Sequence, residues 1–320
     1  MFDSNSSSNY SGVCNIFQKK SLRCQTVYVY CSESYKSTLE KINKTLTFDI
    51  IINDNSLTEF KGKVICYVGS ADLSEKYSRL LIEALEYGGW VESLVDYIER
   101  REGYTEIDLI GKGYFLHQKA FGILSNKKTQ TVKRAVDIFS ALLLLIISLP
   151  ISFVFALLIK LDSKGPIFYM QDRTGLYNQV FKVIKFRSMT VEAEKSGAQW
   201  AQKNDARVTR IGKFIRKTRI DELPQVINIL KGDMSIVGPR PEREFFIGEL
   251  EKEIPYYRFR HAVKPGVTGL AQVSYPYGAS LQDSEWKHRF DLHYIKNHST
   301  LMDIKILFKT VKVVVLGMGQ

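Results

Sequence analysis

The chain has 320 residues, of which 45% are hydrophobic, so it can form two domains or one large one, and disorder is not the default expectation. Its formal net charge of +11 indicates an anionic partner, which could be nucleic acid, an acidic membrane surface or a phosphorylated substrate. The four cysteines form no C-x-x-C pair, which argues against a zinc site or a disulfide framework and favours a reducing compartment: Cys14, Cys24, Cys31 and Cys66.

The N-terminal third predicts a tail followed by a small α/β domain. Residues 1–24 begin with a Ser/Asn-rich stretch that lacks the pattern of a secretion signal, so we expect a disordered tail. Across residues 25–110, short β-branched segments alternate with helical patterns, which predicts a Rossmann-like parallel sheet with crossover helices. No G-x-G-x-x-G motif follows the first strand, so we infer no dinucleotide site, and the role of this domain stays open. Residues 111–131 are expected to form a polar linker.

A long apolar segment indicates that the protein is associated with a membrane. Ile138 to Ile159 carries no charge and is long enough, at about 1.5 Å per residue, to cross a hydrocarbon core. Pro150 lies in its middle, two residues after Ser148, and a proline inside a helix removes a backbone hydrogen bond and bends the axis. We therefore expect a membrane break at Ser148 and Pro150.

The flanks of this segment bear on its topology. Lys133 and Arg134 precede it and Lys160 and Lys164 follow it, so the positive-inside rule gives neither end a preference for crossing. A re-entrant hairpin across residues 138–159 would keep both ends on one face. A simple spanning helix is the alternative that hydropathy alone leaves open.

Two later segments have the pattern of amphipathic interfacial helices on a mostly α-helical, membrane-associated domain. Apolar residues recur at helical spacing among Lys and Arg from Val208 to Lys217, and again near the C-terminus. Ordinary core helices with a solvated basic side are the alternative. The C-terminal apolar positions are Ile304, Leu307, Phe308, Val311 and Val315.

The acidic pair Asp221 and Glu222 is the strongest candidate for chemistry. It precedes a predicted helix that Gly232 closes, with Pro224 tolerated in the first turn. A capping aspartate with a dipole-favoured glutamate would explain the pair without any function. Adjacent carboxylates can also bind Mg²⁺ through oxygen ligands while one of them attacks as a nucleophile.

Cations that could receive phosphate groups lie on both sides of this pair in the sequence. Downstream, glycine and proline fix a turn that presents Arg240 and Arg243, and guanidinium groups match phosphate oxygens in a bidentate manner. Upstream, Lys185 and Arg187 are expected on one face of a strand between Phe181 and Met189. A solvated edge strand would explain this segment equally simply.

Taken together in this order, the motifs from Val132 to Gln320 resemble the bacterial sugar transferases known as monotopic phosphoglycosyl transferases, especially the exopolysaccharide polyprenyl glycosylphosphotransferases. The resemblance covers about three-fifths of the chain. It rests on K-R-x-x-D, Pro150, L-D-S-K-G-P-I-F, K-F-R-S-M, D-E-L-P-Q, G-D-M-S-I-V-G-P-R-P-E-R, P-G-V-T-G and D-L-H-Y-I-K-N.

The resemblance implies that residues 132–320 form a Mg²⁺-dependent catalytic domain. It implies Asp221 as the nucleophile that carries a covalent phosphosugar, and Glu222 as a metal ligand. The reaction would transfer a sugar-1-phosphate from a UDP-sugar to undecaprenyl phosphate, at the cytoplasmic face of the bacterial inner membrane, and so initiate the assembly of an exopolysaccharide or another surface glycan. Arg216, Arg240 and Asp291 are implied as further members of the site.

Three other classes of protein are alternatives to this interpretation. A catalytically inactive, membrane-anchored regulatory protein that binds a nucleotide sugar is the main alternative, although both acids of the pair are present. A nucleic-acid-binding protein is disfavoured because the cations occur with turns and carboxylates and no recognition motif is evident. A glycosidase is disfavoured because adjacent acids cannot readily flank a sugar from opposite faces. The sequence decides neither the sugar nor whether a homo-oligomer forms.

Overall fold

The computed structural model describes residues 26–116, 121–191, 193, 205–276, 278 and 280–315. The chain divides into two compact units, Met1–His117 and Gln118–Gln320, and this boundary falls within the predicted linker. The expected tail, residues 1–24, lies outside the described residues.

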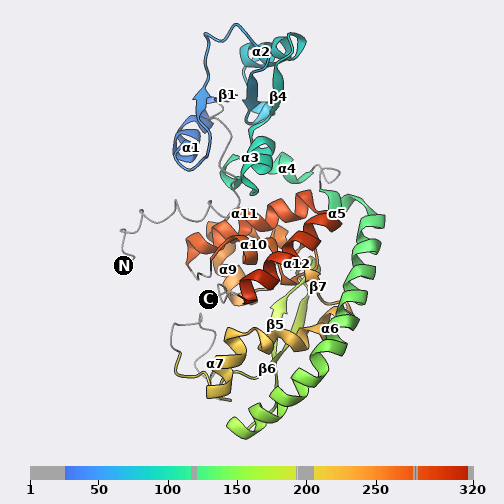
Figure 1. The fold of residues 1–320 in the computed structure, drawn as a ribbon. Coiled ribbons are helices and arrows are strands. Elements are labelled where there is room, and N and C mark those ends of the chain that lie inside the picture. Colours follow the sequence, from blue (N-terminus) through green and yellow to red (C-terminus); the bar gives the residue numbers. More distant parts are fainter. Residues whose placement is uncertain are drawn as a thin grey trace. The chain divides into compact units, whose positions relative to one another are not determined.

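The N-terminal unit is α/β, as the alternating pattern predicts (Figure 1). Its four strands are all parallel and are ordered β2-β1-β3-β4. Helices cross over between β1 and β2 and between β3 and β4, whereas β2 and β3 are joined without a helix. The strands are β1 (Val27–Tyr30), β2 (Ile50–Ile52), β3 (Val64–Tyr67) and β4 (Trp90–Ser93), and the main helices are α1 (Glu33–Asn43), α2 (Glu75–Glu86) and α3 (Leu94–Glu102).

The segment predicted to be a polar linker, residues 111–131, is largely helical where the structure describes it. It contains α4 (Lys112–Leu116), α5 (Gly122–Ser125) and the start of α6 (Lys127–Asp162). The side chain of Asn126 accepts hydrogen bonds from the backbone N–H groups of Lys128 and Thr129, which caps α6 well before the apolar segment begins. Polar composition does not oppose a helix that has a good N-terminal cap, so a segment that joins two units can itself be helical.

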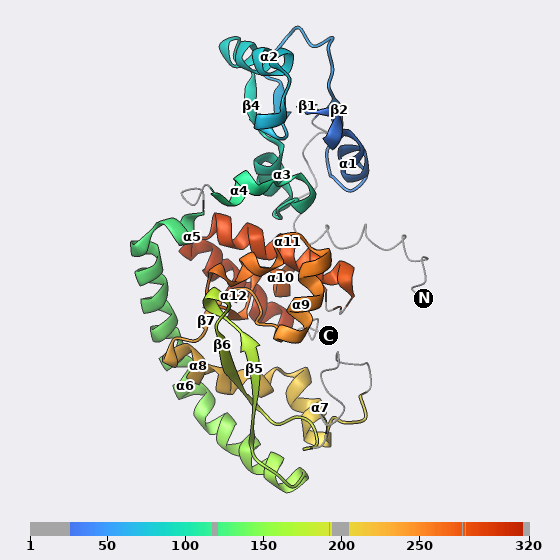
Figure 2. The same cartoon turned by 180° about the vertical axis from the view of Figure 1, so that it is seen from behind.

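Helix α6 has 36 residues and runs without interruption through Pro150. The hairpin predicted for residues 138–159 is therefore not seen: the helix curves along one side of its unit and does not fold back (Figures 1 and 2). Proline removes only one backbone donor, so a long helix can bend at Pro150 without ending there. Ser148 donates its hydroxyl to the carbonyl of Leu145.

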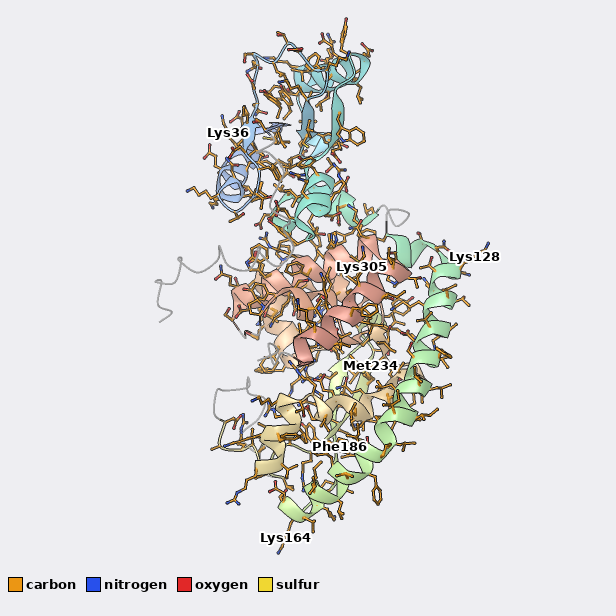
Figure 3. All side chains as sticks on the ribbon, viewed as in Figure 1. Lys36, Lys128, Lys164, Phe186, Met234 and Lys305 are labelled. Carbon is orange, nitrogen blue, oxygen red and sulfur yellow. The ribbon has the colours of Figure 1, made fainter. Side chains whose placement is uncertain are left out.

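The helix is long and apolar enough to cross a membrane, and only 11% of its most apolar window is buried. Its two ends nevertheless pack against the same unit. In its first half, Ala141 lies in a hydrophobic cluster with Ile229 and Met234, and near the end, Ile159 lies in another cluster with Phe186. Figure 3 shows Lys128 and Lys164 at opposite ends of the helix region, with Met234 and Phe186 on its inner side. The apolar middle of α6 faces outward between two anchored ends.

The rest of this unit is mostly helical, with two small sheets. Strands β5 (Phe168–Thr174) and β6 (Val180–Phe186) pair in antiparallel fashion, while β7 (Ser235–Val237) and β8 (Gly266–Thr268) are parallel. The longer helices after α6 are α7 (Arg210–Lys217), α8 (Val226–Lys231), α9 (Glu244–Glu253), α11 (Leu281–Asn297) and α12 (Thr300–Val315), with the short α10 (Leu270–Ser274) between β8 and α11.

The two predicted amphipathic helices differ in what their apolar faces contact. In α7, Ile215 is fully buried against the end of α6 and Phe214 is 53% exposed, so most of its apolar face covers the core. In α12, Ile306 is buried while Ile304, Phe308 and Val311 are exposed. An outward apolar face fits an interfacial helix for α12, whereas α7 has the packing of a core helix with a basic outer side.

Candidate active site

Asp221 and Glu222 lie in the first turn of a 3-10 helix, Ile220–Gln225, that continues directly into α8. Gly232 ends α8 in the left-handed conformation, with φ of 96°, which glycine adopts without strain. The predicted position of the pair at a helix start is thus observed. Both side chains are more than nine-tenths buried, so their charges need compensation from neighbouring groups.

Glu222 receives that compensation from three cations. Arg240 donates from Nη2 to Oε1 of Glu222 at 2.8 Å, and the nearest nitrogens of Lys185 and Arg219 lie 3.6 Å from the same oxygen. Burial by itself raises the pKa of Glu222, but the charges of Arg240, Lys185 and Arg219 outweigh it and hold that pKa well below its usual range. Glu222 is therefore ionised at neutral pH.

Asp221 has the opposite balance. Burial, followed by the negative charge of Glu222, raises the pKa of Asp221 to about 6, against the lowering effect of Lys185, Arg219 and Arg240. Its Oδ1 atom is buried and accepts no hydrogen bond from the described residues. At pH 7 and above, most molecules carry a carboxylate here with one oxygen unpaired by protein groups, which is the form of a carboxylate that can attack or bind a cation.

Lys185 comes from β6 and lies at the pair as predicted. Burial, partly offset by Glu222, lowers the pKa of this amine to about 8. The lysine is thus protonated at neutral pH but loses its charge in mildly basic solution.

The loop that carries Arg240 is built by close packing of two glycine-containing turns. Gly238 donates to the carbonyl of Thr268, and Gly266 donates to the carbonyl of Pro239. A Cβ atom on Gly238 would lie 2.5 Å from the carbonyl oxygen of Lys264, so only glycine permits this approach. The motifs around Gly238 and Gly266, which are separate in sequence, therefore form one structural element that presents Arg240.

The K-R-x-x-D motif has a structural role at the base of α6. Arg134 donates to the carbonyls of Ile229 and Leu230 in the last turn of α8 and so acts as a C-terminal cap together with the N–H of Gly232. Asp137 is buried and accepts from the hydroxyl of Ser235 and from the backbone N–H of Ile236. These contacts fasten α6 to α8, which continues from the turn that carries the acidic pair, and to β7.

Arg187, predicted to bind substrate beside Lys185, does not lie at the pair. Its guanidinium donates to the carbonyls of Ile159, Ser163 and Lys164, and so it caps the C-terminal end of α6. The β6 strand ends at Phe186, which is why the expected alternation does not carry Arg187 to the same place as Lys185.

The remaining predicted residues lie further out. Asp291 is buried and its Oδ2 accepts from Arg260 at 2.7 Å, and burial raises its pKa to about 6 despite that arginine. Arg216 is on α7, where its charge acts on Asp205. Arg243 is the residue that precedes α9. The structure thus brings Lys185 and Arg240 to the acidic pair. Asp291 is linked to Arg240 through Arg260, which donates to the carbonyl of Arg240.

Sequence reasoning missed three arginines. Arg219 contacts Glu222 and adopts a left-handed backbone conformation with φ of 59°. It lies two residues before Asp221, the first residue of the D-E-L-P-Q motif, and that proximity was a usable signal. Arg173 and Arg260 hold the loop of Arg240, and their role depends on tertiary contacts that no local pattern reveals.

Comparisons with known proteins agree with this geometry. A model of the family described as bacterial sugar transferase matches residues 128–317. The chain is 40% identical over 257 residues, which are 80% of this chain and 59% of the relative, to a UDP-N-acetylgalactosamine-undecaprenyl-phosphate N-acetylgalactosaminephosphotransferase of Aeromonas hydrophila. It is 45% identical over 182 residues, 56% of this chain and 39% of the relative, to a UDP-glucose:undecaprenyl-phosphate glucose-1-phosphate transferase of Escherichia coli (strain K12).

A putative undecaprenyl-phosphate N-acetylgalactosaminyl 1-phosphate transferase of Bacillus subtilis (strain 168) is 57% identical over 129 residues, which are 40% of this chain and 72% of the relative. The chain spans about three-fifths of the length of the A. hydrophila relative and about two-fifths of the E. coli one. The family match covers more than half of the chain and includes the acidic pair and the helix α6. This chain therefore belongs to the bacterial sugar transferase family.

Proposed function

We propose that this protein is a phosphoglycosyl transferase that moves a sugar-1-phosphate from a UDP-sugar to undecaprenyl phosphate, with Asp221 as nucleophile. The observation that carries the proposal is the buried carboxylate of Asp221, whose Oδ1 has no hydrogen-bond partner among the described residues and whose neighbour Glu222 is surrounded by cations. The names of the family members support the substrate class.

The chemistry follows from this arrangement in two displacements. A carboxylate oxygen of Asp221 would attack the phosphorus that bears the sugar, and the bond to the leaving UMP oxygen would break. An oxygen of the polyprenyl phosphate would then attack the same phosphorus and release the carboxylate. Attack on a negatively charged phosphate requires neutralisation, which Lys185, Arg219 and Arg240 can supply from fixed positions.

The residues at the site also fit Mg²⁺. Asp221 and Glu222 offer carboxylate oxygens, and Oδ1 of Asp221 is buried without a protein donor, which is a costly state that a cation would relieve. No group of three or more His, Cys, Asp or Glu side chains is gathered for a metal in the described part of the chain, which suits an ion that keeps waters and substrate phosphates as its other ligands. When bound, Mg²⁺ would offset negative charge on the diphosphate.

The lipid acceptor and the membrane fit the same proposal. Both ends of α6 are fastened to one unit, by Arg134 and Asp137 near the start and by Arg187 near the end. That unit would lie on one face of the bilayer, with the exposed apolar middle of α6 in the lipid. Since UDP-sugars are cytosolic, we place the unit on the cytoplasmic face of the inner membrane.

The proposal is tested by incubating the full chain in lipid nanodiscs with undecaprenyl phosphate and a panel of UDP-sugars, and measuring UMP. The panel includes UDP-N-acetylgalactosamine, UDP-glucose and UDP-galactose. We expect UMP release with at least one donor, its loss in Asp221→Asn, and no effect of Asp172→Asn, which changes an exposed carboxylate on β5. Binding of a UDP-sugar without any UMP release would instead favour the inactive regulatory alternative.

Chelation provides an independent check. We expect activity to disappear with EDTA and to return when Mg²⁺ is added, because the site offers hard oxygen ligands. Full activity after thorough chelation would contradict the assignment of Mg²⁺.

A further inference from the structure

The loop that presents Arg240 is held by its backbone carbonyls at three consecutive residues. Arg260 donates from Nη2 to the carbonyl of Arg240 at 3.1 Å, and Arg173 donates from Nη1 to the carbonyl of Pro241 at 3.2 Å. The backbone N–H of Thr174 donates to the carbonyl of Glu242 at 3.0 Å. Two of these three contacts come from arginine side chains.

Arg260 is the more deeply buried of the two arginines and is itself fixed from three sides. It is 3% exposed and forms an ion pair with Asp291 at 2.7 Å. Its Nη1 donates to the hydroxyl of Tyr257, and its guanidinium lies over the ring of that tyrosine. A buried guanidinium with this many fixed partners cannot move independently of α11, which carries Asp291.

A continuous set of contacts therefore leads from α11 to the acidic pair. Asp291 holds Arg260, Arg260 holds the backbone of Arg240, and the guanidinium of Arg240 donates to Glu222 at 2.8 Å. Asp291 and Arg260 are each nearly inaccessible to solvent. Neither side chain is placed to touch a substrate that arrives from solvent or from the bilayer.

We propose that Arg260, anchored by Asp291, is a positioning residue that fixes the backbone of Arg240 and so directs its guanidinium towards Glu222 and the substrate phosphate. The inference rests on the proposed function only for its effect on turnover. Asp291 was expected to bind substrate. By this proposal it instead anchors Arg260, which positions Arg240 for the substrate phosphate.

The kinetic test is a double-mutant cycle on UMP release. Arg260→Lys keeps a charge for Asp291, but one amine cannot reproduce the fork that reaches Asp291, Tyr257 and the carbonyl of Arg240 together. We expect kcat to fall by about a hundredfold, since misplacement of a charged group by about 1 Å has effects of that size. In an Arg240→Ala background, Arg260→Lys should lower kcat by less than about twofold, because the guanidinium that Arg260 positions is absent.

Arg258→Lys is the matched control, because Arg258 lies two residues away and pairs with Glu244 and Glu251 at the surface. It should leave kcat unchanged. If Arg260→Lys lowers kcat by the same factor with and without Arg240, then Arg260 acts independently of Arg240 and the proposal is wrong.

Hydrogen exchange gives a readout that does not require turnover. In Arg260→Lys, without substrate, we expect faster exchange in peptides that cover residues 238–243 and unchanged exchange in α11. Unchanged exchange in the loop overturns the proposal, even if the protein proves to have no transferase activity. If exchange in α11 also becomes faster in Arg260→Lys, Asp291→Asn replaces it in both experiments. The amide oxygen of Asn keeps the hydrogen bond to Arg260 but removes the charge. The loss of kcat must then again depend on Arg240, and exchange in residues 238–243 must again become faster.

Discussion

Asp221 is placed where its charge is unfavourable for folding and favourable for chemistry. Burial and the neighbouring Glu222 raise its pKa to about 6, from an ordinary value of 3.8. Its Oδ1 lacks a donor among the described residues. A carboxylate kept in this state is a reactive group whose desolvation costs stability, and such trade-offs are typical of active sites.

The first prediction concerns this cost. Because the folded-state pKa of Asp221 is raised, the folded protein binds more protons than the unfolded chain between about pH 4 and pH 6, so stability falls as pH rises through this window and stays lower above it. Asp221→Asn removes the charge and should stabilise the protein at pH 7.5 by roughly 1–3 kcal/mol. Thermal unfolding in nanodiscs measures this. The difference from wild type should vanish near pH 4, and a variant less stable than wild type at pH 7.5 would contradict the assigned environment.

Arg240 supports a second prediction at this scale. Its guanidinium donates to Glu222 through Nη2. Only a planar group with several N–H donors can hold this contact and bind phosphate oxygens at the same time. Arg240→Lys should lower kcat/KM by about 10- to 100-fold, although the charge is kept. Arg207→Lys, which alters an arginine paired with Asp205, is the control and should behave as wild type. Near-normal kinetics for Arg240→Lys would reduce Arg240 to a structural role.

Local motifs in the sequence singled out four residues that lie together in the structure. Asp221, Glu222, Lys185 and Arg240 meet in the structure as the motifs suggested. The role of Arg260 could not be predicted, because its contacts with Arg240 and Asp291 join residues 20 and 31 positions apart. Pairings of that kind are fixed by tertiary packing, which local periodicity does not encode.

At the scale of elements, α6 is fastened to the segment that carries Arg240. Asp137, one of the buried polar residues of this helix, holds the N–H of Ile236 and the hydroxyl of Ser235 in β7. β7 leads directly into the loop of Arg240, so the position of the helix is coupled to the position of that arginine. The K-R-x-x-D motif is explained by this attachment.

The third prediction tests this attachment. Asp137→Ala leaves the N–H of Ile236 buried without its acceptor, which should cost about 1–3 kcal/mol of stability. Thermal unfolding in nanodiscs should show a lower Tm than wild type. Asp172→Ala removes an exposed carboxylate and should change the Tm little. Equal Tm values for the two variants would show that the buried contacts of Asp137 do not fasten α6.

The sequence located the apolar part of α6 but not its bounds or its shape. The helix begins at Lys127 because Asn126 caps it, and it continues through Pro150 without a break. Hydropathy reports which residues avoid water, whereas contacts at both ends decide whether a proline bends or divides a helix. Those contacts involve Ile229 near the start and Phe186 near the end, and neither is visible locally.

For the unit Gln118–Gln320 as a whole, the attachment of both ends of α6 to one body limits how the proposed membrane helix could lie at a bilayer. A hydrocarbon core of about 30 Å cannot separate the two ends while both contact the same globular unit. The helix would therefore enter and leave on one face, although it curves and does not form the tight hairpin expected from the sequence.

The fourth prediction is that positions on both sides of α6 are cytoplasmic. Single cysteines at Ser125 and Lys217, which are both exposed, are introduced into a cysteine-free background. Both should resist an impermeant thiol reagent in intact cells and react after lysis. Labelling of the Ser125 position alone in intact cells would establish a spanning helix and contradict the one-face arrangement.

The central claim, that Asp221 carries the sugar phosphate, is tested most directly by trapping the intermediate. Trypsin cleaves after Arg219 and Lys231, so Asp221 falls in one peptide, Ile220 to Lys231. When the protein is incubated with its UDP-sugar and Mg²⁺ but without lipid acceptor, then quenched in acid and digested, this peptide should gain the mass of one sugar phosphate at Asp221. The adduct should disappear when undecaprenyl phosphate is added and be absent from Asp221→Asn. Turnover of the UDP-sugar with an unmodified peptide, or with the adduct on another residue, would contradict the account.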